Sequence, residues 1–259
     1  MAFKNYHRIS FIITIVFVAF YGTLLAGIGD SEESEIPIVI NRVSYEQRLK
    51  VQLEENASTG YTWHYYLSET NAFSLFSKEI SVDQSENAVE GGDSTVTWLF
   101  SPESLGSFAI IFKLYREREG EEKFLDIRVF NVEVDDRTLS ECIPDYVTVL
   151  DSSSGSVSPG DLFAVTTEED LSVGFSWSVR SDTEILRLMD DRYIDPSKSQ
   201  SSPGDISNFP METAEPGKRL FYFEALKRGV YLIELEFSGT VENYGTASTL
   251  YAGVSVEQR

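Results

Sequence analysis

One aromatic turn motif occurs twice in this chain, and the repeat constrains the fold more than any other feature. Residues 56–63 read Asn-Ala-Ser-Thr-Gly-Tyr-Thr-Trp, and residues 170–177 read Asp-Leu-Ser-Val-Gly-Phe-Ser-Trp. The glycines of the two copies, and likewise their tryptophans, are 114 residues apart. In a chain of 259 residues this spacing predicts two similar domains of about 100 residues, each large enough to bury its own core.

Alternating apolar and polar residues predict β-strands in both halves. Leu49, Val51 and Leu53 are separated by polar residues, which is the two-residue period of a strand with one buried face. The other apolar residues with this period are Val96, Trp98, Phe100, Phe108, Ile110, Phe112, Leu114, Leu125, Ile127, Val129, Phe221, Phe223, Tyr231, Ile233, Leu235 and Phe237. Short strands between Gly, Ser, Asn and Asp turns are typical of β-sandwiches. The chain is therefore predicted to be all-β, with two tandem immunoglobulin-like antiparallel β-sandwiches after an N-terminal apolar segment.

Charge and proline positions predict where the parts of the chain begin and end. The predicted parts are 1–29 as a signal peptide or membrane anchor, 30–137 as the first sandwich, 138–145 as a linker, and 146–259 as a second, divergent sandwich. Pro144 disfavours strand pairing inside the linker. Residues 183–190 fit a short strand or a single helical turn, and the Ser- and Pro-rich stretch 197–216 is predicted to be a long loop.

The N-terminal segment has the pattern of an export signal. Lys4 and Arg8 precede a largely apolar run from Phe11 to Ile28. Its length is near the ~20 residues that span a bilayer, whereas small residues just before Asp30 fit a cleavage site. Cleavage and membrane anchoring through residues 9–28 both stay open. In either case we expect a secreted or cell-surface protein.

The ionisable residues exclude several classes of function. Asp and Glu number 42 against 21 Lys and Arg, so the chain repels nucleic-acid phosphates, and no nucleic-acid partner is predicted. Cys142 is the only cysteine, which rules out an intrachain disulfide, and we interpret it as a residue without chemistry.

Candidate catalytic and metal-binding groups are scarce. Outside the leader the only histidine is His64, which is expected to lie in a strand. Zinc sites need several His or Cys ligands, and the carboxylates around Asp190, Asp191 and Asp195 match no calcium loop. The sequence therefore predicts no enzyme, cofactor or metal, although a pair of Cys142 and His64 in space is left open.

Three polar turns of the first half are expected to lie at one end of its sandwich. They are centred on residues 56–60, on Gly91-Gly92 and on residues 115–121. Their glycines permit positive φ and close backbone approach, and Arg116 beside Tyr115 is a combination favoured at protein interfaces. This arrangement predicts a binding edge made of loops.

The order of these motifs resembles the chagasin-type inhibitors of papain-like cysteine peptidases. In that family the first motif reads Asn-Pro-Thr-Thr-Gly followed by Tyr or Phe, the second reads Gly-x-Gly-Gly, and the third reads Arg-Pro-Trp. The resemblance covers residues 36–135 well and 146–257 only faintly. It implies an immunoglobulin-like fold whose three loops plug the peptidase cleft, with Ser58 and Thr59 over the enzyme's catalytic cysteine and histidine.

The resemblance also implies which residues touch the enzyme. The protease-binding residues it implies are Asn56, Ser58, Thr59, Gly60, Tyr61, Gly91, Gly92, Tyr115, Arg116 and Arg118. This sequence departs from the family at Ala57 and Val89, and its third loop lacks the Pro and Trp. Loss of an aromatic anchor can cost about 2 kcal/mol, roughly thirtyfold in affinity. The alternative function is therefore a cell-surface adhesion or assembly module that retains the inhibitor fold.

The second copy of the motif helps to separate fold from function. Leu171 and Val173 occupy the places where a contacting turn would need small polar groups, whereas Gly174, an aromatic residue at Phe175 and Trp177 remain. The kept positions are interpreted as fold determinants, and the polar residues of the first copy as candidates for function. Residues 56–58 are also an acceptor sequence for N-glycosylation, and a glycan there excludes use of the turn for binding.

Overall fold

The computed structural model describes residues 34–82, 94–137, 146–149, 153–180, 184–196, 216–239 and 246–257. The apolar leader, the predicted linker 138–145 with Cys142, and the predicted second loop with Gly91 and Gly92 lie outside these residues. Most of the predicted long loop 197–216 lies outside them too. None of the helices in the described part of the chain is both long and apolar enough to cross a membrane.

The prediction of an all-β chain of two sandwiches is confirmed. In the first half the strands are β1 (Ser34–Pro37), β2 (Ile40–Ser44), β3 (Arg48–Glu55), β4 (Thr62–Leu67), β5 (Phe73–Val82), β6 (Ser94–Pro102), β7 (Gly106–Tyr115), β8 (Asp126–Asp135) and β9 (Tyr146–Thr148). In the second half they are β10 (Ser154–Val157), β11 (Leu162–Glu169), β12 (Phe175–Arg180), β13 (Leu186–Ile194), β14 (Gly217–Ala225), β15 (Gly229–Gly239) and β16 (Thr246–Val256). The segment 183–190, for which two alternatives were open, contributes to the strand β13.

Each sandwich has two four-stranded sheets. The first sandwich has the orders β2-β8-β7-β4 and β5-β6-β3-β9, and the second has β1-β11-β14-β13 and β10-β16-β15-β12. Most pairs are antiparallel, but β1, β2, β9 and β10 each join a sheet edge in parallel. The alternating residues of β3, β6 and β7 fill the first core, in which Trp98, Phe100 and Phe112 are fully buried, and the rings of Trp98 and Phe112 meet edge to face.

The expected inward face of β8 differs from the structure. Leu125 precedes β8 and is half exposed, and Ile127 and Val129 belong to a separate buried cluster outside the first core. The residues of β8 that enter the first core are Phe130, Val132 and Val134. Both faces of β8 are thus buried, and for that reason its apolar pattern does not show which face meets the core.

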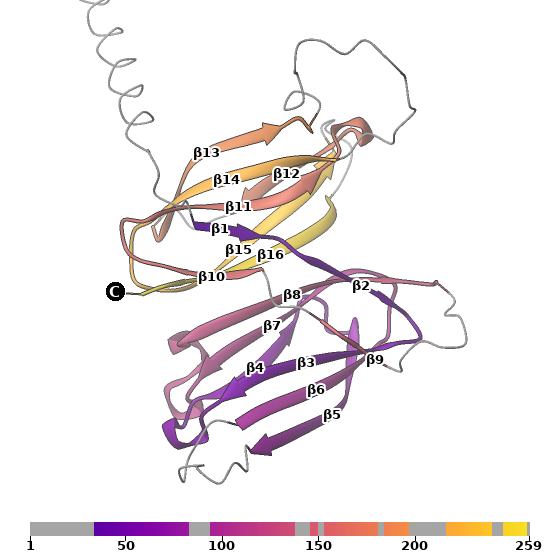
Figure 1. Cartoon of the computed structure of the whole chain (residues 1–259), viewed down its shortest axis with the longest axis vertical. Helices are drawn as coiled ribbons and strands as arrows, with labels where there is room; N and C mark the ends of the chain where they lie inside the picture. Colours follow the sequence, from indigo (N-terminus) through magenta and orange to yellow (C-terminus); the bar gives the residue numbers. More distant parts are fainter. Residues whose placement is uncertain are drawn as a thin grey trace, which may run out of the picture. The chain divides into compact units, whose positions relative to one another are not determined.

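One strand of each predicted domain pairs with the sandwich of the other: β1 lies in the predicted domain 30–137, and β9 lies in the predicted domain 146–259. β1 joins β11 of the second sandwich, and β9 joins β3 of the first, as Figure 1 shows for the indigo strand β1 beside β11. The segments next to these strands are also hydrogen-bonded, because Val39 donates its N–H to Ser153 Oγ at 3.0 Å. Val39 and Ser153 are 114 residues apart, which is the spacing of the repeated turns. The predicted division at 138–145 stays a prediction, but strands cross it in both directions.

Candidate functional site

The first loop, Asn56–Gly60, is a short turn held by its own polar side chains. Asn56 Oδ1 accepts the N–H of Ser58 at 3.1 Å and also the Ser58 hydroxyl. The carbonyl oxygen of Asn56 accepts the Thr59 hydroxyl at 2.7 Å, and residues 57–59 form one 3-10 turn. Local bonds of this kind fix a turn without help from a partner. Ser58, Thr59 and Gly60 are exposed at its tip.

Gly60 ends the turn in a left-handed conformation. Its φ is 73°, which side chains other than glycine rarely adopt, although a Cβ at this position would meet no atom within 4 Å. Glycine is therefore required here by the backbone and not by crowding. The chain then enters β4 at Thr62.

A buried carboxylate fixes the strand that follows the turn. Glu55 is 7% exposed, and its Oε2 accepts the N–H of Trp63 at 3.0 Å. The indole Nε1 of Trp63 donates to the carbonyl oxygen of Glu54 at 2.8 Å. These two bonds join the residues on either side of the first loop, so the loop projects from a closed base.

Arg116 connects the first loop to the third loop, which we define as residues 116–125 between β7 and β8. Its Nε donates to the carbonyl oxygen of Thr59 at 3.1 Å, and its guanidinium lies 4.3 Å from the ring centroid of Tyr61. The same guanidinium contacts Glu119 at 3.1 Å. A planar guanidinium with five donors can serve a carbonyl, a carboxylate and a ring at once, which an ammonium group cannot do as well.

The third loop consists of two short 3-10 turns, Glu117–Glu119 and Glu121–Lys123, joined at Gly120. Arg118 is largely exposed and approaches Glu119 only at 3.9 Å. Arg116 and Arg118, both named as protease-binding residues by the resemblance, therefore differ: the first holds the loops together and the second faces solvent. An exposed pair such as that of Arg118 contributes about 0–1 kcal/mol to stability.

Tyr115 is buried beneath the site and does not lie on its surface. It is 9% exposed, and the ring of His64 stacks on it at 4.0 Å between centroids. Its hydroxyl lies 2.9 Å from that of Tyr66, which donates to Glu121 at 2.6 Å. Burial, followed by the hydrogen bonds to Glu121 and Tyr115, raises the pKa of Tyr66. Tyr115 thus supports the third loop from below.

His64 lies in β4, as expected from the sequence, and is partly buried. Its Nε2 is 3.0 Å from the Thr62 hydroxyl, and burial lowers the pKa of the imidazole. With its ring against Tyr115 and its nitrogen beside a threonine, it has the surroundings of a packed strand residue.

The turn of the second sandwich repeats the backbone of this construction and one of its side-chain bonds. Asp170 accepts the N–H of Ser172 at 2.9 Å, as Asn56 does from Ser58, and Gly174 has the same φ of 73° as Gly60. Ser172 corresponds to Ser58. The serine therefore belongs to the construction of the turn in both copies, and Thr59, replaced by Val173, is the tip residue that differs.

The carboxylate at the base of the turn is also repeated. Glu169 accepts the N–H of Trp177 at 2.9 Å, and the indole Nε1 of Trp177 donates to the carbonyl oxygen of Glu168 at 3.0 Å. These carboxylates were not predicted from the sequence, although a Glu-Glu pair, Glu54-Glu55 or Glu168-Glu169, immediately precedes the turn in both copies. The repeat of this pair is the sequence signal that identifies them.

Within the described residues, the second sandwich has no counterpart of the arginine bridge. Tyr115 pairs with Thr62 in the first sandwich, and Ser238 pairs with the corresponding Ser176 in the second. Gly239 therefore stands where Arg116 stands, with no side chain to reach the turn. The two sandwiches share the turn but not the arginine that fastens it to its neighbour.

The structure places most of the predicted site residues together. Asn56, Ser58, Thr59, Gly60 and Tyr61 form the first loop and its exit, and Arg116 joins them from the third loop. Gly91 and Gly92 lie outside the described residues.

In the part of the chain that the structure describes, no group of three or more His, Cys, Asp or Glu side chains is arranged to hold a metal ion. Asp190 and Asp191 instead contact Arg192 and Arg219, at 2.6 and 2.7 Å.

Comparison with known proteins identifies a family whose model matches this chain. The family model described as chagasin family peptidase inhibitor I42 matches residues 42–134 and 156–251, one match in each sandwich. Among curated proteins, none matches the chain significantly.

Solved structures with similarity to this chain include two small proteins. The cysteine protease inhibitor EhICP2 from Entamoeba histolytica is 22% identical with a TM-score of 0.35, covering 40% of this chain and 99% of the inhibitor. Amebosin is 18% identical with a TM-score of 0.27, covering 40% of this chain and 88% of amebosin. The C-terminal domain of the Streptococcus agalactiae AgI/II polypeptide BspA is 9% identical with a TM-score of 0.24, covering 85% of this chain and 96% of that domain.

Proposed function

Because the chain belongs to the chagasin family of peptidase inhibitors, we propose that its first sandwich inhibits papain-like cysteine peptidases reversibly. The first loop enters the active-site cleft of the enzyme, with Ser58 and Thr59 over the catalytic cysteine and histidine. The second and third loops contact the walls of the cleft. Family members are inhibitors and not enzymes, so the proposed mechanism has no covalent step.

The observation that carries the proposal is the contact of Arg116 with both Thr59 and Tyr61. A wedge that enters a narrow cleft has to be rigid before it binds, because loops that become ordered on binding weaken the affinity. The internal bonds of Asn56 fix the shape of the first loop, and Arg116 fixes its position relative to the third loop. The third loop lacks the Pro and Trp of the family motif, but the first and third loops are still held in place before binding by the bonds of Asn56 and Arg116.

The proposal is tested by titrating papain with residues 34–259 and following hydrolysis of a fluorogenic peptide. We expect reversible inhibition that Ser58→Arg abolishes, because a long cation at the tip cannot enter the cleft. Ser172→Arg, at the same place in the second sandwich, is the matched control and leaves inhibition unchanged. No inhibition at tens of micromolar would refute the proposal for papain-like targets.

A surface adhesion or assembly module is the second candidate, and one observation favours it. The turn of the second sandwich exposes Leu171 and Val173 by 48% and 52%, and apolar side chains at a rigid tip suit a protein partner. A pull-down with Leu171→Asp and Val173→Asp as controls separates the candidates. Recovery of a surface protein that depends on these two residues, together with no peptidase, favours the module.

Export of the chain is part of the proposal, and the apolar leader at residues 9–28 supports it. Either a secreted or a membrane-anchored inhibitor meets peptidases outside the cell. Intact mass of the protein isolated from its source distinguishes a cleaved leader from an anchor. The same measurement detects a glycan on Asn56, which would block the first loop.

A further inference from the structure

We propose that the second sandwich is a brace that holds the first and third loops of the first sandwich, with Ser255 and Tyr251 as positioning residues for inhibition. The proposal rests on the proposed function, because these are the loops assigned there to the peptidase. In this proposal the second sandwich contributes to inhibition by supporting the first, and its own turn, which has no counterpart of Arg116, does not have to bind the peptidase.

The outer face of β7 and β8 is an apolar surface that the second sandwich covers. Ala109, Ile111, Ile127 and Val129 are buried there, outside the first core. The partly buried residues packed against them come from β15 and β16, namely Val230 and Tyr251, and from the first sandwich, namely Tyr66 and Phe124. Phe124 lies in the third loop, so one cluster joins the second sandwich to that loop.

A buried asparagine fixes β16 against this face. Asn131 of β8 is 0% exposed, its Nδ2 donates to the carbonyl oxygen of Tyr251 at 2.9 Å, and its Oδ1 accepts the N–H of Tyr251 at 2.9 Å. Its Nδ2 also donates to Ser153 Oγ at 3.1 Å. A buried amide left without partners costs about 1–3 kcal/mol, so this contact selects one register between the two sandwiches.

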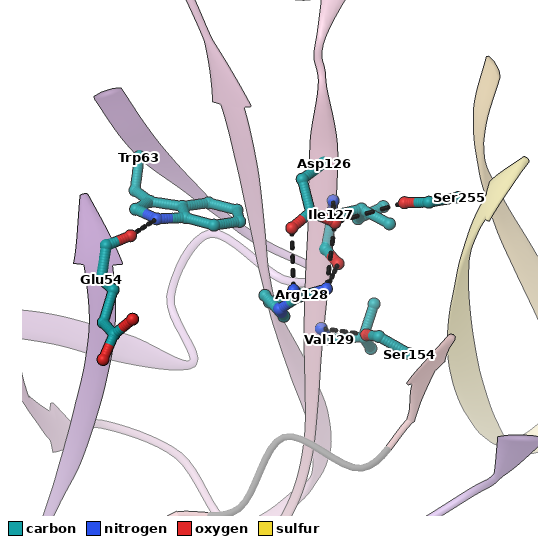
Figure 2. A network of polar contacts seen from close by, with 8 residues as sticks. All are labelled: Glu54, Trp63, Asp126, Ile127, Arg128, Val129, Ser154 and Ser255. Carbon is teal, nitrogen blue, oxygen red and sulfur yellow. Dashed lines mark hydrogen bonds and ion pairs between the residues drawn. The ribbon is translucent and has the colours of Figure 1, made fainter. Parts of the chain in front are cut away.

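A second set of contacts lies between β16 and the base of the first loop, and Figure 2 shows the residues involved. Ser255 Oγ donates to Asp126 Oδ1 at 3.2 Å, and Asp126 contacts Arg128 at 2.8 Å. The Arg128 guanidinium lies 6.0 Å from the ring centroid of Trp63, whose indole donates to Glu54. Glu54 is two residues before Asn56. A hydrogen bond, an ion pair and one guanidinium–ring contact therefore link β16 to the closed base from which the first loop projects.

The third loop is held from the same side. Tyr66, which packs against the shared cluster, donates its hydroxyl to Glu121 in the second 3-10 turn at 2.6 Å. The ammonium group of Lys113 lies 5.2 Å from the ring centroid of Phe124 and 4.8 Å from that of Tyr66. Displacing the second sandwich would expose this cluster and remove the packing beneath the loop.

The close approach of the two sandwiches depends on Gly253 of β16. A Cβ at this position would lie 2.7 Å from Ile127 Cγ2 and 3.3 Å from Val129 Cγ2. A valine there would force β16 away from β8. Gly253→Val is therefore expected to separate β16 from β8 at the interface. Ser255→Ala removes only the hydroxyl bonded to Asp126 and introduces no steric clash.

The first experiment measures hydrogen exchange of residues 34–259 without any peptidase. For Gly253→Val we expect amides of residues 116–124 to exchange at least about fivefold faster, because the cluster beneath the third loop is displaced. For Ser255→Ala we expect amides of residues 56–60 to exchange about two- to fivefold faster, since one hydrogen bond toward the first loop is lost. Ser248→Ala on the same strand is the control and leaves these amides unchanged. If Gly253→Val unfolds the protein, exchange of residues 56–60 in Ser255→Ala is the deciding measurement. Unchanged exchange of residues 116–124 in folded Gly253→Val, or of residues 56–60 in Ser255→Ala, overturns the proposal.

The second experiment measures the dissociation constant for papain with the same variants. We expect about fivefold weaker binding for Ser255→Ala, because the loops must then be ordered on binding. Faster exchange with unchanged affinity overturns the positioning role. If the unaltered chain does not bind papain at all, the proposed function fails, and the exchange experiment alone then decides whether the second sandwich braces the loops.

Discussion

The Nε of Arg116 donates to the carbonyl oxygen of Thr59 across 3.1 Å, and this bond joins two loops that are far apart in the sequence. We expect Arg116→Ala to weaken inhibition of papain by about tenfold, because a hydrogen bond from a charged group is worth about 1.5–3 kcal/mol. Arg116→Lys is expected to lose much of the same affinity, since an ammonium group has no planar fork. Inhibition constants check both variants. Arg180→Ala, which removes an exposed arginine paired with Glu236 in the second sandwich, is the control and changes the constant less than about twofold.

Removal of the carboxylate below each turn is expected to destabilise the protein. Glu55→Ala leaves the buried N–H of Trp63 without an acceptor, and Glu169→Ala does the same to Trp177. Each change is expected to reduce the free energy of unfolding by about 1–3 kcal/mol. Chemical denaturation measures it. Glu54→Ala is the control, since only the backbone of Glu54 bonds to the indole, and an equal loss there would contradict the assignment.

The two left-handed glycines are expected to contribute alike to stability and unlike to inhibition. Gly60→Ala and Gly174→Ala each place a Cβ at a φ of 73°, which costs about 1–2 kcal/mol. Asparagine tolerates this conformation better, so Gly60→Asn restores part of the loss. Thermal unfolding and papain titration together check the prediction. Only the changes at Gly60 weaken inhibition, and a similar weakening by Gly174→Ala would argue against a site in the first sandwich alone.

His64 is expected to make stability depend on pH in mildly acidic solution. Burial lowers the pKa of its imidazole in the folded state below the ordinary value of 6.5. Just below pH 6.5 the unfolded chain therefore binds a proton that the folded chain does not, and the free energy of unfolding decreases as pH falls toward the folded pKa.

Denaturation between pH 7.5 and 5 checks this dependence, with His64→Gln as the variant that removes it. His64 is the only histidine after the leader, so its imidazole NMR signals report the pKa directly. A midpoint at or above 6.5 would contradict the lowered pKa.

The repeated turn and the alternating strands were sufficient to predict the two sandwiches. The turn at 56–60 carries its own polar bonds, and local geometry of this kind is predictable from a short stretch of sequence. The predicted grouping of Asn56, Thr59 and Arg116 is consistent with the bond that now joins the loops.

The contacts between the sandwiches could not be predicted from the same patterns. Ala109 and Ile111 sit among core residues in β7, and this continuous apolar run indicates burial on both faces without saying what covers the second one. Asn131 likewise appears as an ordinary polar strand residue. Its partner Tyr251 is 120 residues away, and no local signal connects them.

The exchange of β1 and β9 makes the two sandwiches hard to part. A protease cut between Arg137 and Tyr146 would produce an N-terminal and a C-terminal fragment. Strand β1 of the N-terminal fragment would stay paired with β11 of the C-terminal fragment, and β9 of the C-terminal fragment would stay paired with β3 of the N-terminal fragment. The nicked halves would remain a tight noncovalent pair and migrate together until denatured. An inhibitor exposed to peptidases would thus keep its two sandwiches together after cleavage of the segment that connects them.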